Sequence, residues 1–181
     1  MPWRRVRRGS GARPADDPRL IDRLRPGERV LAAARTAATT ESNVTGASGG
    51  VVGGTARALY LPDGTVLGWN EIDQAVWHLD ESRLDLVTLP IDGPARSYQI
   101  PLADPGRLPE LVRERVTSSI VVNQHVPLVG RKGAKIIGRR LAGLDDLDWI
   151  VVYDHGVDGS DPDVRARVRD AVAVLRRDLG V

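Results

Sequence analysis

The sequence predicts an α+β fold with antiparallel strands, and three observations carry this prediction. The stretch 68–89 alternates apolar and polar residues on either side of a polar turn, which is typical of a β-meander. A helical period of apolar residues follows at 108–116, and a second series of strands at 119–153 leads to another helix. Strands and helices do not alternate, so no parallel sheet is expected. We expect about nine strands, one mid-chain helix and one C-terminal capping helix.

The individual elements follow from apolar periodicity and from the positions of Gly, Pro and Asp. A short helix is expected after Asp17, a suitable N-cap residue that precedes Pro18 at the first helical position. Six strands are expected before the mid-chain helix, at 29–38, 55–61, 65–69, 72–77, 84–86 and 95–101. Three more are expected after it, at 119–129, 134–141 and 147–153. Asp161 begins the last helix, whose apolar stripe ends before Gly180.

Positive charge is concentrated at the N-terminus. Residues 1–14 contain five arginines and no acidic residue, and the whole chain has a formal net charge of +2, which leaves −3 for residues 15–181. We expect a disordered basic arm at 1–14 and a single domain at 15–181. The candidate anion-binding residues of the arm are Arg4, Arg5, Arg7 and Arg8. They favour contact with a phospholipid surface or a nucleic-acid backbone, and a solvated tail without a partner is the alternative interpretation.

The composition argues against several kinds of site and location. The sequence contains no cysteine, so disulfides, thiolate nucleophiles and zinc–thiolate sites are excluded. No apolar run approaches the roughly 20 residues of a membrane-spanning helix, and no apolar segment follows the basic N-terminus as a signal peptide requires. We therefore expect a cytoplasmic protein without a cofactor.

The Gly-rich segment 39–54 can be compared with phosphate-binding loops. Gly49 and Gly54 have the spacing of a Walker loop, but Thr55 occupies the position at which that loop requires lysine. A dinucleotide-binding loop is excluded because neither its glycine spacing nor its following helix is present. We expect instead a mobile loop that runs into a strand with small side chains.

Structural roles are expected for the acidic segment 154–163, for the histidines and for three of the tryptophans. A calcium loop that starts at Asp154 needs a glutamate at its twelfth position, where Arg165 lies, so helix capping is favoured. Metal and acid–base roles are not favoured for the three histidines, which fall on different expected elements: His78, His125 and His155. The chain lacks phenylalanine, so three tryptophans are expected in the core: Trp69, Trp77 and Trp149.

One basic cluster lies within the folded part, on the hairpin expected at 131–140. Its members are Arg131, Lys132, Lys135, Arg139 and Arg140. On a shared face they would form a patch for phosphate or for an acidic partner. The alternative is a solvated hairpin whose charges prevent strand-to-strand aggregation. No aromatic residue lies between them, which makes nucleic acid the less favoured partner.

A family resemblance rests on apolar residues and turns in the first half of the chain. These are 59–61, the turn at 62–64, Trp69 with Glu71 and Ile72, Trp77, Leu84 and Leu86. Followed by an amphipathic helix, this pattern resembles a bacterial pleckstrin-homology-like (GRAM-like) module over about residues 29–119. The whole chain is also similar to small uncharacterised proteins of high-GC Gram-positive bacteria.

The resemblance implies a split-barrel binding scaffold and not an enzyme, with residues 120–181 as a strand–helix extension. Two departures limit what it implies. Six strands are expected before the helix, where that fold has seven. Phosphoinositide-binding members carry basic residues around the first hairpin loop, whereas residues 39–54 contain no lysine or arginine. Recognition of lipid head groups is therefore not implied.

The sequence thus predicts a non-catalytic binding or scaffold protein whose partner is a protein or a peptide. The basic arm would assist it at an anionic membrane surface. A nucleic-acid-associated protein that uses the arm and the hairpin at 131–140 is the alternative. An enzyme with an unrecognised site is the third hypothesis.

Overall fold

Two antiparallel sheets and three α-helices form the part of the chain that the computed structural model describes, namely residues 13–37, 50–91, 93–140 and 147–180. The first sheet contains β1 (Ala32–Thr36), β2 (Val51–Gly54), β3 (Ala58–Tyr60), β4 (Val66–Gly68), β5 (Ile72–His78), β6 (Arg83–Thr88) and β7 (Ser97–Asp104). The second contains β8 (Ile120–Val129), β9 (Lys132–Arg140) and β10 (Leu147–Tyr153). The helices are α1 (Pro18–Ile21), α2 (Leu108–Ser119) and α3 (Pro162–Leu179), with 3-10 turns η1 (Pro14–Asp16) and η2 (Trp69–Glu71). The predicted α+β class is confirmed.

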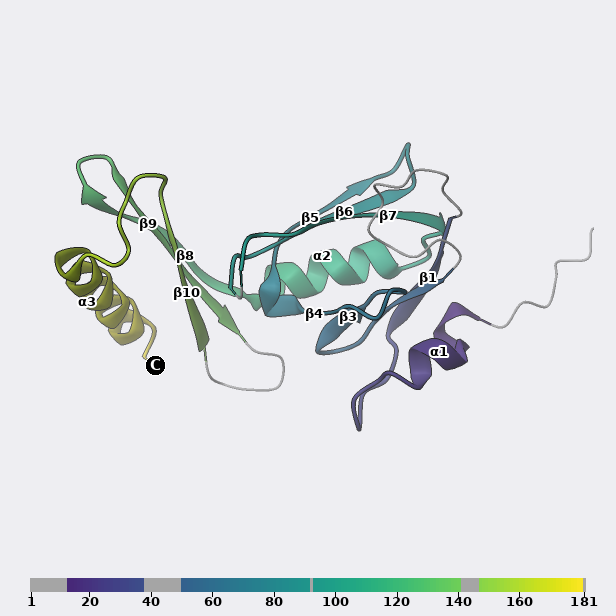
Figure 1. Cartoon of the computed structure of the whole chain (residues 1–181). Coiled ribbons are helices and arrows are strands. Elements are labelled where there is room, and N and C mark those ends of the chain that lie inside the picture. Colours follow the sequence, from purple (N-terminus) through teal and green to yellow (C-terminus); the bar gives the residue numbers. More distant parts are fainter. Residues whose placement is uncertain (1–12, 38–49, 92, 141–146, 181) are drawn as a thin grey trace, which may run out of the picture.

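The first sheet forms a half-barrel around α2. Its strand order is β4-β3-β2-β1-β7-β6-β5, and all neighbouring strands are antiparallel. The sheet curls so that α2 lies between its two halves (Figure 1). The predicted helical stripe of Leu108, Val112 and Val116 is buried in one cluster with Trp69 and with apolar residues from both halves of the sheet. Burial of this stripe fixes the helix inside the curl.

The strand β2 brings the number of strands before α2 to seven among the described residues, one more than the six expected. Its two glycines explain how a strand can be buried on both faces. A side chain at Gly53 would collide with Leu20 of α1 on one face, and a side chain at Gly54 would collide with Leu111 of α2 on the other. The sequence Val51–Gly54 is therefore a strand selected for close packing and not a phosphate-binding loop.

The N-terminal segment covers the outside of the half-barrel. Asp17 caps α1 as predicted, because its carboxylate accepts a hydrogen bond of 3.0 Å from the backbone N–H of Arg19. Leu20 of this helix is buried in a second cluster with Val51, Ala58 and Tyr60. The strands β2 and β3 consequently have a packed outer face as well as a packed inner face.

The second sheet has the order β10-β9-β8 and is covered by α3. Val164 and Val168 of the helix are buried against Leu128 and Ala134 of the sheet. The predicted cap at Asp161 is confirmed, because its carboxylate accepts hydrogen bonds from the backbone N–H groups of residues 163 and 164. The predicted stripe weakens toward the C-terminus, where Val172 is only half-buried.

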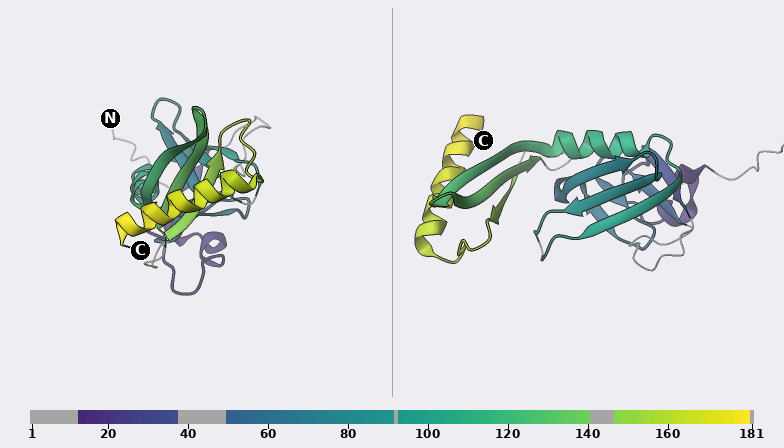
Figure 2. Two further views of the ribbon diagram at one scale, coloured as in Figure 1. Left: turned by 90° about the vertical axis from the view of Figure 1, so that its left-hand side faces the viewer. Right: turned by 90° about the horizontal axis from the view of Figure 1, so that it is seen from above.

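The second sheet projects from the half-barrel, so the molecule is elongated (Figure 2). β8 begins at the residue after the end of α2, with no loop between them. Leu89, which follows β6, packs with Ile137 and Ile150 of the second sheet in a small buried cluster. Within the described ranges, no helix is long and apolar enough to cross a membrane.

The tryptophans divide between core and periphery. Trp69 is buried with 3% of its surface exposed, and its indole N–H donates a 3.1 Å hydrogen bond to the carbonyl of Thr55. Trp77 and Trp149, also expected in the core, are only half-buried. Trp77 packs on the rim of the half-barrel core, whereas the guanidinium of Arg176 lies 5.6 Å from the ring centre of Trp149.

Candidate functional site

Arg139, predicted as part of an exposed anion-binding patch, is instead buried between the two sheets, with 1% of its surface exposed. Its guanidinium donates hydrogen bonds to Ser119 Oγ at 2.8 Å, to the Ile72 carbonyl at 2.9 Å and to the Val116 carbonyl at 3.3 Å. Burial lowers the pKa of Arg139, and the nearby carboxylate of Asp73 opposes this shift. Arg139 remains charged at neutral pH because its pKa starts far above 7. The prediction of a ligand-binding role is therefore wrong for this residue.

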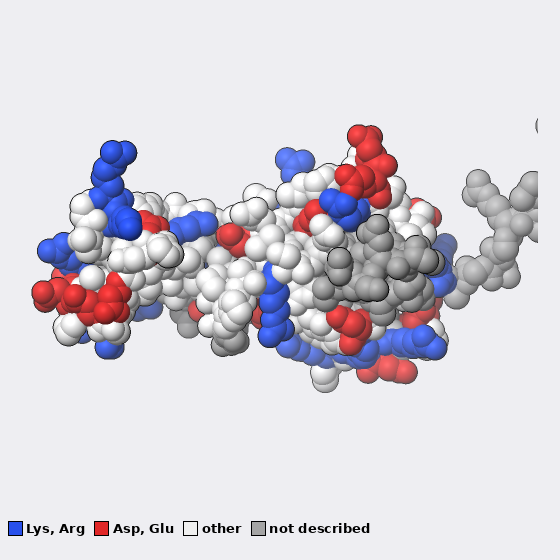
Figure 3. Space-filling model, turned by 45° about the horizontal axis from the view of Figure 1, so that its top comes forward, with Lys and Arg blue, Asp and Glu red and all other residues white. Residues whose placement is uncertain are grey.

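The other members of the predicted cluster do not form one patch. The ammonium group of Lys135 lies 3.5 Å from the Asp73 carboxylate, which compensates its charge. Arg131, Lys132 and Arg140 are exposed, but the extended β9 separates Lys132 from Arg140 by about 26 Å. Acidic and basic side chains are interspersed on the face that Figure 3 shows. The arm residues lie outside the described part of the chain: Arg4, Arg5, Arg7 and Arg8.

Two of the histidines pair with aspartates, which the sequence analysis did not predict. His125 Nε2 lies 2.9 Å from Asp154 Oδ2, and His78 Nε2 lies 3.0 Å from Asp85 Oδ2. The hydrogen bond with His125 lowers the pKa of Asp154, and the bond from the backbone N–H of Gly133 lowers it further. The pair of His78 and Asp85 joins the neighbouring strands β5 and β6, whereas the pair of His125 and Asp154 joins β8 to the residue that follows β10. Both pairs are partly exposed to solvent. In the described residues, no three metal-ligating side chains come together.

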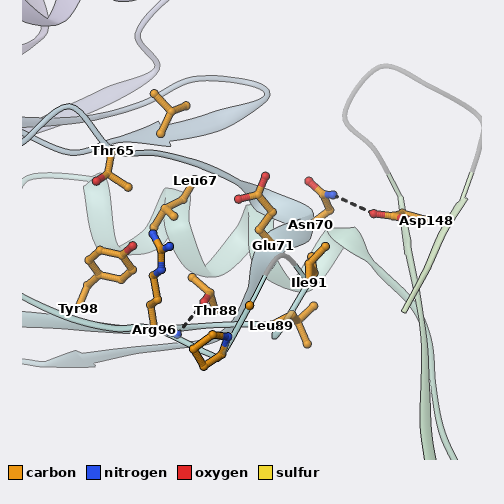
Figure 4. A pocket seen from close by; sticks show the side chains of 13 residues that line it. Thr65, Leu67, Asn70, Glu71, Thr88, Leu89, Ile91, Arg96, Tyr98 and Asp148 are labelled. Atoms are coloured by element: carbon orange, nitrogen blue, oxygen red, sulfur yellow. Dashed lines mark hydrogen bonds between the residues drawn. The ribbon is translucent and has the colours of Figure 1, made fainter. Parts of the chain in front are cut away.

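A pocket of about 320 Å³ opens where the half-barrel meets the second sheet. Side chains from β4, η2, the end of β6, the start of β7 and β10 line it (Figure 4). One part of its wall is apolar and includes Leu67, Leu89 and Ile91. The polar and charged lining residues are Thr65, Asn70, Glu71, Thr88, Arg96, Tyr98 and Asp148. The pocket therefore offers both an apolar surface and groups of both charges.

Hydrogen bonds hold the elements around this pocket in place. The Thr88 hydroxyl accepts a 2.9 Å bond from the backbone N–H of Arg96, which fixes the start of β7 against the end of β6. The backbone N–H of Leu89 donates to the carbonyl of Glu71 at 2.8 Å. The amide of Asn70 donates to Asp148 at 3.4 Å and so connects η2 to β10. The site is consequently assembled from both sheets.

The side chains of Arg96, Tyr98 and Glu71 point into the same space (Figure 4). Tyr98 is buried with 4% of its surface exposed, whereas Arg96 lies at the surface and is open to solvent. A guanidinium and carboxylates at the rim of an apolar cavity can bind a ligand that carries both charges, such as a peptide segment. The sequence analysis missed this site because its residues come from five separate segments.

No family model, no curated protein and no solved structure matches this chain. The pocket at the junction of the two sheets combines apolar side chains with a guanidinium and carboxylates, which makes it a candidate binding site.

Proposed function

We propose that the protein is a non-catalytic binding module that holds a peptide segment of a partner protein in the pocket beside Arg96 and Glu71. The observation that carries this proposal is the combination of an apolar wall with a guanidinium and carboxylates in one pocket. A peptide presents the complementary groups, because its backbone and side chains combine apolar surface with charge of either sign.

The size of the pocket also favours a peptide. Its volume of about 320 Å³ lies at the lower end of the roughly 300–1,000 Å³ range of ligand pockets. It therefore accommodates a few side chains and leaves the rest of a longer segment at the surface. Ile91, at the mouth, is 40% exposed and provides apolar surface for that contact.

We further propose that the half-barrel and α2 form the pleckstrin-homology-like scaffold expected from the sequence. Seven strands precede α2 in the described structure, and the pleckstrin-homology-like fold also has seven strands before its helix. This agreement supports the assignment. In this proposal the partner is a protein or peptide of the cytoplasm, and the basic arm adds contact with an anionic membrane surface.

The peptide proposal can be tested with random-sequence peptides displayed on phage and selected against the full chain. Arg96 is exposed, so Arg96→Glu should fold normally while reversing a charge at the pocket. The matched control is Arg113→Glu, which reverses an exposed charge on α2 away from the pocket. We expect Arg96→Glu to lower the affinity for the selected peptides about tenfold or more, as measured by fluorescence polarisation. Arg113→Glu should leave this affinity unchanged. Failure to enrich peptides, or equal affinities for all three proteins, would contradict the proposal.

A further inference from the structure

One flank of α3 carries a row of arginines. At 100° per residue, Arg165, Arg169 and Arg176 project from the helix within about 40° of one another. The residues on the other flank include Asp163 and Asp178, so the charge of the helix is asymmetric around its axis. The buried stripe of Val164 and Val168 lies between these flanks.

The arginine flank faces the edge strand β10. The Arg176 guanidinium lies over the ring of Trp149, at 5.6 Å from its centre. Arg165 and Arg169 line a shallow groove of about 410 Å³ together with Tyr153 and two residues of α3. Trp149 and Tyr153 have side chains on the same face of β10, because they are four residues apart in a strand. The row of arginines therefore runs alongside β10.

The same strand has an open backbone edge. Among the described residues β10 pairs only with β9, and it lies at the end of the sheet. The backbone N–H of Asp154 donates to the carbonyl of Gly133 at 2.9 Å. This bond shows which residues of β10 direct their backbone groups toward β9. By the alternation of an antiparallel ladder, the backbone groups of Trp149, Val151 and Tyr153 then point away from β9. They are available to an additional strand.

The charge beside this edge is uncompensated. Arg165 and Arg169 are exposed, and neither forms an ion pair with any residue in the described ranges. By contrast, Arg167 on the other flank donates a 2.8 Å hydrogen bond to the carbonyl of Leu128 and is fixed to the sheet. The free guanidinium groups would repel a second copy that approached with the same flank, so this edge does not favour self-association.

We propose that the groove between the arginine flank of α3 and the edge of β10 binds an extended acidic peptide segment of a partner protein as a fourth strand. Backbone hydrogen bonds to β10 would supply affinity, and the arginines would select carboxylates at alternate positions. The spacing fits, because Arg165 and Arg169 are about 6 Å apart along the helix axis and alternate residues of a strand are about 6.8 Å apart. The groove shares no lining residue with the pocket beside Arg96, so the two proposals are independent.

A labelled peptide of about 12 residues, in which glutamate alternates with valine or threonine, tests the proposal on the full chain. We expect the double variant Arg165→Glu/Arg169→Glu to lower its affinity about tenfold or more. The control is Arg113→Glu/Arg177→Glu, which changes the net charge equally at exposed positions away from the groove. It should bind the peptide like the unaltered protein, and circular dichroism should show the same melting temperature for all three.

Two further probes examine the binding mode. A peptide with the same sequence but with alternate backbone amides N-methylated cannot complete the ladder, and we expect it to lose most of its affinity. A single-stranded DNA of similar length and charge should bind more weakly than the unmodified peptide. The proposal is overturned if the unmodified peptide does not bind, if both double variants weaken it equally, if N-methylation has no effect, or if the DNA binds more tightly.

Discussion

The guanidinium of Arg139 donates a 2.9 Å hydrogen bond to the backbone carbonyl of Ile72, and this contact joins β9 of the second sheet to β5 of the half-barrel. The same guanidinium bonds the end of α2 through Ser119. One buried charge therefore connects the three elements that meet at the junction. The Nε–H of Arg139 is buried and has no hydrogen-bond partner in the described structure. The guanidinium therefore uses only some of its donors in these contacts.

We expect Arg139→Met to lower the free energy of unfolding by about 3 kcal/mol, because it removes the buried guanidinium that donates to the Ile72 carbonyl and to Ser119 Oγ. Urea denaturation measures this change. The control is Arg140→Met at the next, exposed position, which should change stability by less than about 0.5 kcal/mol. Equal effects of the two substitutions would show that Arg139 does not hold the junction.

Gly133 in β9 tolerates no side chain. A Cβ there would collide with the backbone carbonyl of Val126 on β8, which cannot move without breaking the sheet. We expect Gly133→Ala to cost about 3 kcal/mol or more in a urea melt. Gly138→Ala is the comparison within the same strand, because its new methyl group would meet the side chain of Val122 at 3.2 Å. It should cost clearly less, and the reverse order would contradict the described register of β8 and β9.

The hydrogen bond between Glu28 and Tyr60 predicts a pH dependence of stability. Burial raises the pKa of Glu28, but hydrogen bonds from Tyr60, Thr55 and the backbone N–H of Arg25 outweigh it and lower the pKa. A carboxyl whose folded-state pKa is depressed stabilises the fold above its unfolded pKa, here 4.5, and this contribution is lost as the pH falls through the lower folded value.

We therefore expect Glu28→Gln to destabilise the protein by about 1–2 kcal/mol at pH 7 and by progressively less below about pH 4.5. Urea melts from pH 7 to pH 3 measure the difference. Glu110→Gln, at an exposed position on α2, should give a curve parallel to that of the unaltered protein. A pH-independent cost of Glu28→Gln would mean that the carboxylate is not what stabilises this site.

The two tryptophans of the meander should differ in their contribution to stability. Trp69 is buried and hydrogen-bonded, so Trp69→Ala should cost about 3–5 kcal/mol through the cavity that it leaves. Trp77 is half-buried at the rim, and Trp77→Ala should cost about half as much. Chemical denaturation measures both losses. Acrylamide quenching of single-tryptophan variants gives a second comparison, in which the quencher should reach Trp77 more readily than Trp69.

Deleting residues 1–12 should abolish most affinity for vesicles that contain anionic lipid, because four of the five arginines of the basic arm lie there. Cosedimentation at two salt concentrations measures this affinity, which should fall with salt because exposed charges are screened over about 8–10 Å. The truncated chain retains η1, which contacts β1 and β2, so its melting temperature should be unchanged. Undiminished vesicle binding by the truncated chain would contradict a role for the arm.

The sequence was sufficient to predict those elements whose apolar residues follow a regular period. The stripe of α2, the strand Leu147–Tyr153 and the cap at Asp161 were predicted correctly for this reason. The strand β2 was predicted only as the end of a loop, because two of its four residues are glycines that carry no periodic pattern. The two glycines are needed because Leu20 packs against one face of β2 and Leu111 against the other, and only the folded structure shows these contacts.

The sites could not be predicted in the same way. A charged residue in a polar hairpin, such as Arg139, is normally solvated, and only the docking of the two sheets shows that it is buried. The pocket beside Arg96 joins segments that are up to about 80 residues apart, as the contact between Asn70 and Asp148 shows. The arginine flank of α3 could be recognised by its spacing, but its meaning depends on which strand it faces.

The direct passage from α2 into β8 has a mechanical consequence. The ten residues of β8 extend over about 33 Å from the end of α2, which is itself packed inside the half-barrel. A small rotation of α2 therefore corresponds to a larger displacement at the far end of β8. A tilt of α2 by about 5° would swing the far tip of the hairpin through about 3 Å. Such a tilt would have to break the contact of Arg139 with Ile72 and that of Leu89 with Ile137, so these two contacts hold the hairpin at a fixed angle to the half-barrel.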